Sequence, residues 1–343
     1  MNETPELRRD PITGRWVLIA PARARRPIAL TGHVPHARTN GERFPCPFCA
    51  GQEADTPNEV FAYRPPGSMP NGPGWTLRIV PNMYPAVHVE AAQPAAIVAE
   101  TFLESAPAVG YAEVLIDCPQ HIDNPTQLSD VQFRDVFRAY RERMRALAAD
   151  GRLAHVAVFK NVGAEAGASL GHTHSQLIST PIVPELVQHE LTAAEGYHRR
   201  YGRCVYCDMI ERELADGARL VARSEHFIAV TAFAPRFAYE LWVLPVAHQA
   251  RYEAISDEEA LELAVLLKRV LGSLDQCQHL PAYNWFLHTT PLRAGEPRYY
   301  HWHLEITPRT ARPAGFEWGF GCHITTVAPE VAAEQLRAAL PPP

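Results

Sequence analysis

Two short motifs, each present twice, carry side chains that can bind a metal ion or attack phosphorus. Cys-x-x-Cys occurs at residues 46–49 and 204–207, and His-x-His occurs at residues 172–174 and 301–303. A Cys-x-x-Cys turn supplies two ligands of a tetrahedral zinc site, and imidazoles can supply the others. Imidazole is also a nucleophile, because it is largely neutral at pH 7 and forms a phosphoramidate that can pass its group onward. The alternation of Cys pair and His pair indicates an internal repeat.

A second pattern supports the repeat. Two stretches align without a gap, each with Glu, His and Ser at intervals of eight residues. These residues are Glu113, His121 and Ser129 in one stretch, and Glu240, His248 and Ser256 in the other. Each half therefore offers one more histidine beside its Cys and His pairs.

The repeat predicts two zinc sites with the same composition. Each would use two cysteines, the histidine of the aligned stretch and the first histidine of the His-x-His pair. The predicted sets are Cys46, Cys49, His121 and His172 in the first half, and Cys204, Cys207, His248 and His301 in the second. Four protein ligands make a closed, structural site, with no position left for a catalytic water.

The second histidine of the first pair, His174, is then free for chemistry. We expect a strand here, on which His172, His174 and Gln176 share one face. Gln176 could hydrogen-bond a phosphoryl group that His174 has accepted. The second half has Glu305 in the matching position, where a carboxylate would repel phosphate, so we predict that His303 is not a nucleophile. A zinc protein without catalysis is the competing class, since two zinc sites can hold a fold by themselves.

Matching elements are expected to position these residues in both halves. Ser129 and Ser256 are each followed three residues later by Gln or Glu, the capping box of a helix start, and apolar residues at helical spacing follow both. The expected strands are 114–116, 155–161, 241–244 and 283–289, together with the two His-x-His segments. We therefore expect an α+β fold of two repeats. The predicted domains are residues 1–183 and 184–343, joined within the Pro-containing stretch 179–186.

Composition excludes several classes of protein. The chain has 343 residues, of which 47% are hydrophobic and 20% charged, so a folded globular protein is expected. Its net charge of −6, with no basic run, argues against nucleic acid or an anionic membrane as partner. The N-terminus has no apolar segment of the secretory kind, and no stretch approaches 18 apolar residues. We expect a cytoplasmic protein whose cysteines stay reduced.

Several longer motifs give the chain a family resemblance. They are RRDPITGRWVLIAPARARRP, CPFCAGQE, IVPNMYPAV, NVGAEAGASLGHTHSQ, YYHWHLEITP and AGFEWGFG. The sequence resembles the galactose-1-phosphate uridylyltransferases of the histidine-triad superfamily over nearly its whole length. The resemblance implies two histidine-triad-like repeats, each a half-barrel of antiparallel strands with packed helices, in a homodimer. It also implies ping-pong transfer of a nucleotidyl group from UDP-glucose to galactose 1-phosphate, in which a nucleotidyl-histidine is the intermediate.

The resemblance assigns a role to individual residues of this sequence. It makes His174 the nucleophile and Gln176 the residue that hydrogen-bonds the covalent intermediate. The implied substrate contacts are Arg23, Arg26, Asn161 and Ser169 for the phosphates, Asn82 for the base and ribose, and Glu317 for the hexose.

Three departures from the uridylyltransferases fall in specificity elements. Thr173 stands between the histidines where those enzymes have proline, Met83 and Tyr84 replace Asp-Phe after Asn82, and the glutamine expected after Glu317 is absent. A sister branch with Ser or Thr between the histidines includes adenylyltransferases that phosphorolyse ADP-glucose. Uridylyl transfer is thus the first expectation, and an ADP-glucose phosphorylase, or a hydrolase on the same scaffold, is the alternative.

The second metal site also has an alternative. Some members of the family lack the second Cys pair and bind iron there through a Glu, a further His and both histidines of the second pair. Because Cys204 and Cys207 are present, we expect zinc, with Glu190, His288 and His303 as alternative ligands.

Overall fold

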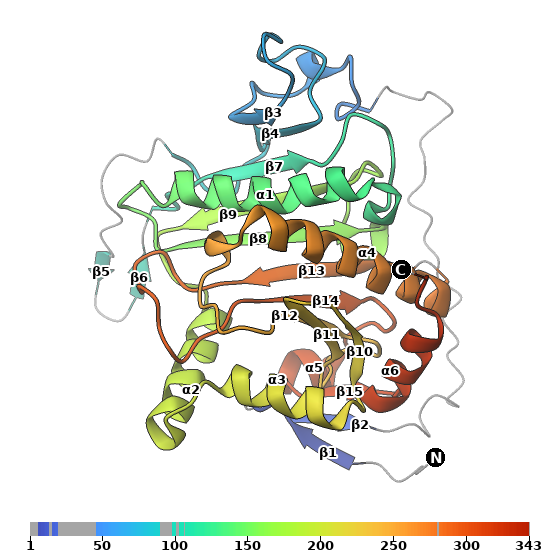
Figure 1. Cartoon of the computed structure of the whole chain (residues 1–343). Helices are drawn as coiled ribbons and strands as arrows, with labels where there is room; N and C mark the ends of the chain where they lie inside the picture. The colour runs from blue at the N-terminus through green and yellow to red at the C-terminus, as the bar shows by residue number, and fades with distance from the viewer. Residues whose placement is uncertain are drawn as a thin grey trace.

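A ten-stranded antiparallel sheet forms the centre of the protein (Figure 1). The computed structural model describes residues 6–13, 16–19, 46–89, 98–100, 103–105, 107–279 and 281–342. The first half of the chain supplies β3 (Phe61–Tyr63), β4 (Leu77–Pro81), β7 (Ala112–Ile116), β8 (His155–Val162) and β9 (His174–Thr180). The second half supplies β10 (Leu220–Arg223), β11 (Phe227–Thr231), β12 (Leu241–Pro245), β13 (Tyr283–His288) and β14 (His303–Pro308).

The strand order repeats the sequence pattern. From the middle outward, the first half runs β8, β9, β7, β4, β3 and the second half runs β13, β14, β12, β11, β10. The halves join where β8 and β13 pair antiparallel, with Phe159 opposite Phe286. The predicted α+β fold of two repeats is therefore confirmed, and the repeats share one continuous open sheet.

Helices α1 (Asp130–Leu147) and α4 (Asp257–Gln278) lie side by side on one face of this sheet (Figure 1). Both begin with the predicted capping boxes: the hydroxyls of Ser129 and Ser256 accept from the backbone N–H groups of Gln132 and Glu259, whose side chains accept in turn from the backbone N–H groups of the two serines. The predicted apolar positions of both helices are buried against the sheet: Phe133, Val136, Phe137, Tyr140, Met144, Leu263, Leu266, Leu267, Val270 and Leu274. Helix α6 (Pro329–Ala338) packs on α4 and on β10.

The opposite face of the sheet differs between the halves. In the second half, α2 (Glu185–Tyr201) and α3 (Val205–Asp216) pack their apolar side chains against β11 and β12. In the first half, the corresponding apolar cluster consists of Trp75, Val80, Val114 and Ile116, with Phe48 beside them. The His-x-His motif of the second half is thus covered by helices, and that of the first half meets a smaller cluster.

Short elements complete the fold. Strands β1 (Glu6–Arg9) and β2 (Trp16–Ile19) form a small sheet with β15 (His323–Thr325), and β5 (Val98–Glu100) pairs with β6 (Leu103–Ser105). Helix α5 (Gly315–Phe320) precedes β15. Single 3₁₀ turns lie at Glu53–Asp55, Pro125–Gln127, Ala164–Ala166 and Tyr252–Ala254. Across the ranges that the structure describes, no helix combines the length and the apolar character needed to cross a membrane.

Candidate active site and metal centres

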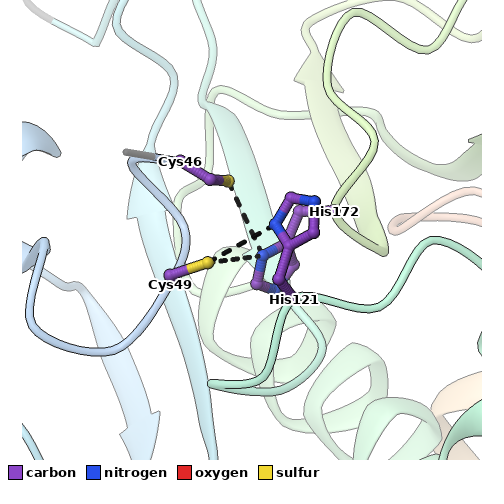
Figure 2. Close-up of side chains that lie close together, drawn as sticks. All are labelled: Cys46, Cys49, His121 and His172. Atoms are coloured by element: carbon purple, nitrogen blue, oxygen red, sulfur yellow. Dashed lines mark hydrogen bonds between the residues drawn. The ribbon is translucent and has the colours of Figure 1, made fainter. Parts of the chain in front are cut away.

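The residues of the first predicted metal set lie together. The cysteines occupy the turn at 46–49, His121 follows β7, and His172 precedes β9. Nδ1 of His121 lies 3.4 Å from the Cys49 sulfur, and Nδ1 of His172 lies 3.7 Å from both sulfurs. All four ligand atoms are within 4.8 Å of one another, and Figure 2 shows the side chains converging from separate segments. This set could hold a metal ion.

A backbone hydrogen bond orients the ring of His172. Its Nε2 donates to the carbonyl oxygen of Cys118 at 2.9 Å, so the lone pair of Nδ1 faces the thiols. Metal-binding histidines typically donate their second nitrogen in this way, which fixes the tautomer and the ring orientation. Burial also lowers the pKa of His172, which favours the neutral imidazole that a metal needs.

The second predicted set has the same geometry. The Cys207 sulfur lies 3.3 Å from Nδ1 of His248 and 3.8 Å from Nδ1 of His301. Nε2 of His301 donates to the carbonyl oxygen of Pro245 at 2.9 Å, as His172 does to Cys118. With Cys204, the N-cap of α3, the four ligand atoms are again within 4.8 Å of one another. This set could also hold a metal ion.

A third group of potential ligands lies in the second half, separate from the second cysteine set. Its members are Glu190, His288, His303 and Glu305, all buried and with ligand atoms within 4.8 Å of one another. His288 Nδ1 lies 3.0 Å from a Glu190 carboxylate oxygen, and Arg236 donates to Glu305. Burial lowers the pKa of His288, but the two carboxylates outweigh it and raise the pKa to about 9. The proposed alternative ligands of the second metal thus form an ion-pair network of their own.

His174 opens strand β9 and carries a usable lone pair. Its Nδ1 donates to the carbonyl oxygen of His172 at 2.7 Å, so Nε2 is unprotonated in the neutral ring. Burial lowers the pKa of His174, which keeps the ring neutral near pH 7. Phe48 contacts the imidazole edge-on, with ring centroids 5.3 Å apart. Gln176, half-buried, follows on the same face of the strand. A neutral imidazole held in this way can act as a nucleophile.

His172 lies in the turn before the strand. We expected it to share a strand face with His174, but β9 begins only at His174. The strand thus begins two residues later than expected, and the His172 ring lies next to the thiols of the first set. The rings of His172 and His174 therefore contact different residues, although only one residue separates them in the sequence.

A cavity of about 1120 Å³ adjoins the first His-x-His motif. Asn161 and Ser169 line it, together with Thr173 and much of the loop after β8, whereas His174 and Gln176 do not. Asn284, from the second half, donates to Asn161 at 2.6 Å and to the carbonyl oxygen of Ala166 at 2.8 Å. The structure thus gathers two of the four predicted phosphate contacts, Asn161 and Ser169, on one cavity next to the first His-x-His motif.

Two other predicted contacts have local roles. The Asn82 side chain accepts from the backbone N–H of Tyr84 at 2.9 Å, forming a turn beyond β4. The Glu317 carboxylate accepts from the backbone N–H of Ala314 at 2.8 Å and caps α5. Helix α5 lies beside β15, among the elements of the second half in the lower part of the view, whereas β9 lies in the first half of the sheet above them (Figure 1). Glu317 is not among the residues that line the cavity next to the first His-x-His motif.

The sequence matches two models of known protein domains. Residues 1–184 match the model for the N-terminal domain of galactose-1-phosphate uridyl transferase, and residues 190–341 match that for its C-terminal domain. The chain belongs to the galactose-1-phosphate uridyl transferase family. This is a family of nucleotidyltransferases.

Individual relatives of this family member fall in two groups. ADP-glucose phosphorylase of Arabidopsis thaliana is 34% identical and aligns over 98% of this chain and 93% of its own. Galactose-1-phosphate uridylyltransferase of Haemophilus influenzae is 27% identical, over 98% and 95%. The crystal structure of the Arabidopsis phosphorylase with bound ADP-glucose superposes with a TM-score of 0.83 at 33% identity, covering 97% of this chain and 99% of that one. A uridylyltransferase structure gives 0.74 at 30% identity, covering 98% of both.

The second copy of the histidine motif is closed in this family member. His303 is 0% exposed, compared with 6% for His174. Its ring is stacked between those of Trp242 (5.1 Å) and His288 (4.8 Å), and Tyr206 of α3 lies 5.1 Å away. A ring packed in this way leaves no room for a phosphate, so the first copy is the candidate active site.

Three polar residues near His174 were not predicted. Lys160 is buried on β8 and Asp117 is buried directly after β7, both in segments that read as apolar, and Asn284 reaches Asn161 from the other half. A charged residue within or next to an apolar strand is the only sequence signal for the first two. The two predicted arginines, Arg23 and Arg26, lie outside the described residues.

Proposed function

We propose that the protein transfers a nucleotidyl group from a nucleotide sugar by way of a covalent intermediate on His174. The hydrogen bond from Nδ1 of His174 to the His172 carbonyl oxygen carries this proposal, because it leaves Nε2 free to attack. Membership of a nucleotidyltransferase family supports the reaction class.

The reaction has two displacement steps. Nε2 of His174 attacks the α-phosphorus, and an N–P bond forms while the bond from that phosphorus to the bridging oxygen breaks. The sugar 1-phosphate leaves with this oxygen. An acceptor phosphate oxygen then attacks the same phosphorus, breaks the N–P bond and restores the neutral imidazole. Because the leaving group is a phosphate anion, no strong general acid is needed, and positioning and charge stabilisation lower the barrier.

We infer that ADP-glucose is the donor and inorganic phosphate the acceptor, giving ADP and glucose 1-phosphate. The higher identity and TM-score of the Arabidopsis phosphorylase support this choice. So do Thr173 between the histidines, and Met83 and Tyr84 after Asn82, which depart from the uridylyltransferase pattern. The favoured donor is thus ADP-glucose, which the sequence analysis gave as the alternative to UDP-glucose.

Uridylyl transfer from UDP-glucose to galactose 1-phosphate is the second candidate. Two observations favour this candidate. Both matching family models are described as galactose-1-phosphate uridyl transferase, and Asn82 stands at the base-contact position that the resemblance implies.

One experiment separates the two candidates. The purified protein is incubated with ADP-glucose or UDP-glucose, each with phosphate or galactose 1-phosphate, and the nucleotide products are measured by chromatography. We expect ADP from ADP-glucose and phosphate at a rate well above that of the other three pairs. Faster formation of UDP-galactose would establish the uridylyltransferase instead, and turnover of neither donor would contradict both.

We propose that both Cys/His sets hold structural zinc. Zinc bonds of about 2.3 Å to sulfur and 2.1 Å to nitrogen place tetrahedral ligands about 3.6 Å apart. The sulfur to nitrogen contacts of Cys46 with His172, of Cys49 with both histidines and of Cys207 with both histidines run from 3.3 to 3.8 Å. Two thiolates in each set favour zinc over iron. Bound zinc would fix His172, whose carbonyl oxygen orients His174.

We propose that the protein forms a homodimer in which Glu317 of one chain contacts the substrate bound to the other. Helix α5 exposes Phe316, Trp318 and Phe320 to solvent, with exposed fractions of 42%, 79% and 76%. Burying these rings against a second chain would stabilise a dimer and could bring Glu317 to the cavity of that chain. Gel filtration with light scattering tests this part of the proposal, since a monomer would contradict it.

A further inference from the structure

Three buried polar side chains surround the peptide segment that carries His174. Thr173 donates from its hydroxyl to the Asp117 carboxylate at 2.7 Å. Lys160 donates to the same carboxylate and also to the carbonyl oxygen of His174 at 3.0 Å. The Lys160 and Asp117 side chains are fully buried. Together these three residues form what we call the Thr-Asp-Lys network.

The network fixes the backbone on both sides of the nucleophile. The Thr173 N–H donates to the carbonyl oxygen of Ile122 at 2.7 Å, and its carbonyl oxygen accepts from the Asp117 N–H at 3.3 Å. Thr173 is thus held by its backbone and by its hydroxyl, while Lys160 holds the carbonyl oxygen of His174. The His172 carbonyl, which belongs to the same short segment, in turn sets the direction of the His174 ring.

The second half shows that the fold does not require these polar groups. In the first half, Lys160 pairs with Ser175, the residue after His174. In the second half, Leu287 pairs with Leu304, the residue after His303, so Leu287 occupies the position of Lys160. Thr173 corresponds to Trp302, and the gapless alignment places Leu244 against Asp117. Buried ion pairs are often no more stabilising than apolar residues of similar size. The half with apolar residues at these positions is the one whose histidine is closed off.

We propose that the Thr-Asp-Lys network is a set of positioning residues that holds Nε2 of His174 in line for attack on phosphorus. This inference rests on the proposed covalent mechanism. None of the three side chains exchanges a proton or an electron with the substrate. Their contribution is geometric, and misplacing a reacting atom by about 1 Å can lower a rate about 100-fold. The network should therefore affect the rate of nucleotidyl-histidine formation when the nucleotide sugar is saturating.

The test compares variants in a single turnover. Full-length protein is mixed with saturating labelled nucleotide sugar without acceptor, and the rate of covalent labelling is followed by rapid quench. At saturating donor, Thr173→Val should label about 10- to 100-fold more slowly, with unchanged zinc content. Thr173→Ser, which keeps a hydroxyl at this position, should label close to the wild-type rate. The matched control is Thr231→Val, because Thr231 is also buried and donates to the carbonyl oxygen of Pro329 at 2.9 Å in the second half.

A second variant covers the case in which Thr173→Val fails to fold. The triple change Asp117→Leu, Lys160→Met and Thr173→Val removes both charges together and so leaves no unpaired buried ion. It should fold, retain both metal ions and label about 10- to 100-fold more slowly than the wild type. Wild-type labelling rates in Thr173→Val or in the triple variant would overturn the positioning role, as would equal slowing in Thr231→Val. Absence of label in the wild type would instead overturn the proposed function.

Discussion

His174 and His303 occupy matching positions in the two halves, and their surroundings separate their roles. Each donates from Nδ1 to the carbonyl oxygen of the first histidine of its pair, at 2.7 and 3.1 Å. The ring of His174 meets the edge of Phe48 beside a polar cavity, whereas the ring of His303 is stacked between Trp242 and His288. We therefore propose that the same local motif serves chemistry in the first half and packing in the second.

Replacing the proposed nucleophile should abolish turnover without loss of metal. We expect His174→Gly to lower kcat by about 1000-fold or more, because no other group can carry the covalent intermediate. Zinc content should stay at the wild-type value, since the ligand is the neighbouring His172. Steady-state kinetics and elemental analysis on the same sample check both parts. A variant that keeps full activity would remove His174 from the mechanism.

Replacing the counterpart should have the opposite effect. We expect His303→Gln to lower the free energy of unfolding by about 1–3 kcal/mol, because a fully buried, stacked ring is lost. The rate of covalent labelling should stay near the wild-type value. Denaturant unfolding and single-turnover labelling provide the comparison, and a labelling defect as large as that of His174→Gly would contradict the assignment.

The elements after the two Cys pairs explain why the halves differ. Cys204 is the N-cap of α3, whose later residues Met209–Leu214 include the good helix formers Met, Glu, Arg and Leu, and whose buried positions include Tyr206 and Ile210. After Cys49 the chain reads AGQEADTPN, whose Gly and Pro disfavour a helix, and only a 3₁₀ turn forms at Glu53–Asp55. Helix α3 covers the face of His303, and within the described ranges no helix covers that of His174.

The Cys-x-x-Cys turn of the first half should depend on its metal. Wild-type protein is expected to contain two zinc ions per chain, one for each Cys/His set. Cys46→Ser should contain one and melt at a lower temperature, because zinc binding contributes directly to folding. Cys277→Ser is the control, since this partly exposed cysteine lies in neither set. A wild-type protein that folds normally without metal would rule out the zinc sites.

The contact between β11 and α4 predicts a pH dependence. His226, just before β11, lies 2.6 Å from the Glu262 carboxylate, and this hydrogen bond raises the pKa of His226 above 6.5. Because the folded pKa is the higher one, the stabilisation is complete below about pH 6.5 and is lost as pH rises through the folded value. The advantage of wild type over His226→Gln should be below about 1 kcal/mol, since the pair is partly exposed. Urea unfolding should show it near pH 6 and little of it near pH 9, and an advantage that grows with pH would contradict the sign.

At the scale of the whole molecule, the repeat could be predicted because its signals are local. Eight-residue spacing, capping boxes and helical periodicity each lie within one short segment, and all appear in the structure. The grouping of Cys46 and Cys49 with two distant histidines followed from the symmetry of the two halves, since no single segment contains all four ligands.

Other features depend on contacts between distant segments and could not be predicted. The pairing of β8 with β13 joins the halves into one sheet, and nothing in either strand specifies its partner. Glu190 reaches His288 only because α2 packs on the second half, a helix that the sequence analysis did not identify. Lys160 and Asp117 are adjacent only after β8 and β7 have both paired with β9.

The most direct test of the account is the site of the covalent bond. The protein is incubated with ADP-glucose and, in parallel, UDP-glucose, without acceptor, quenched in base and digested, and the modified peptide is sequenced by mass spectrometry. The account predicts an adenylyl group on His174, formed with release of glucose 1-phosphate and removed when phosphate is added. A nucleotidyl group on His303, or no covalent adduct with either nucleotide sugar, would contradict it.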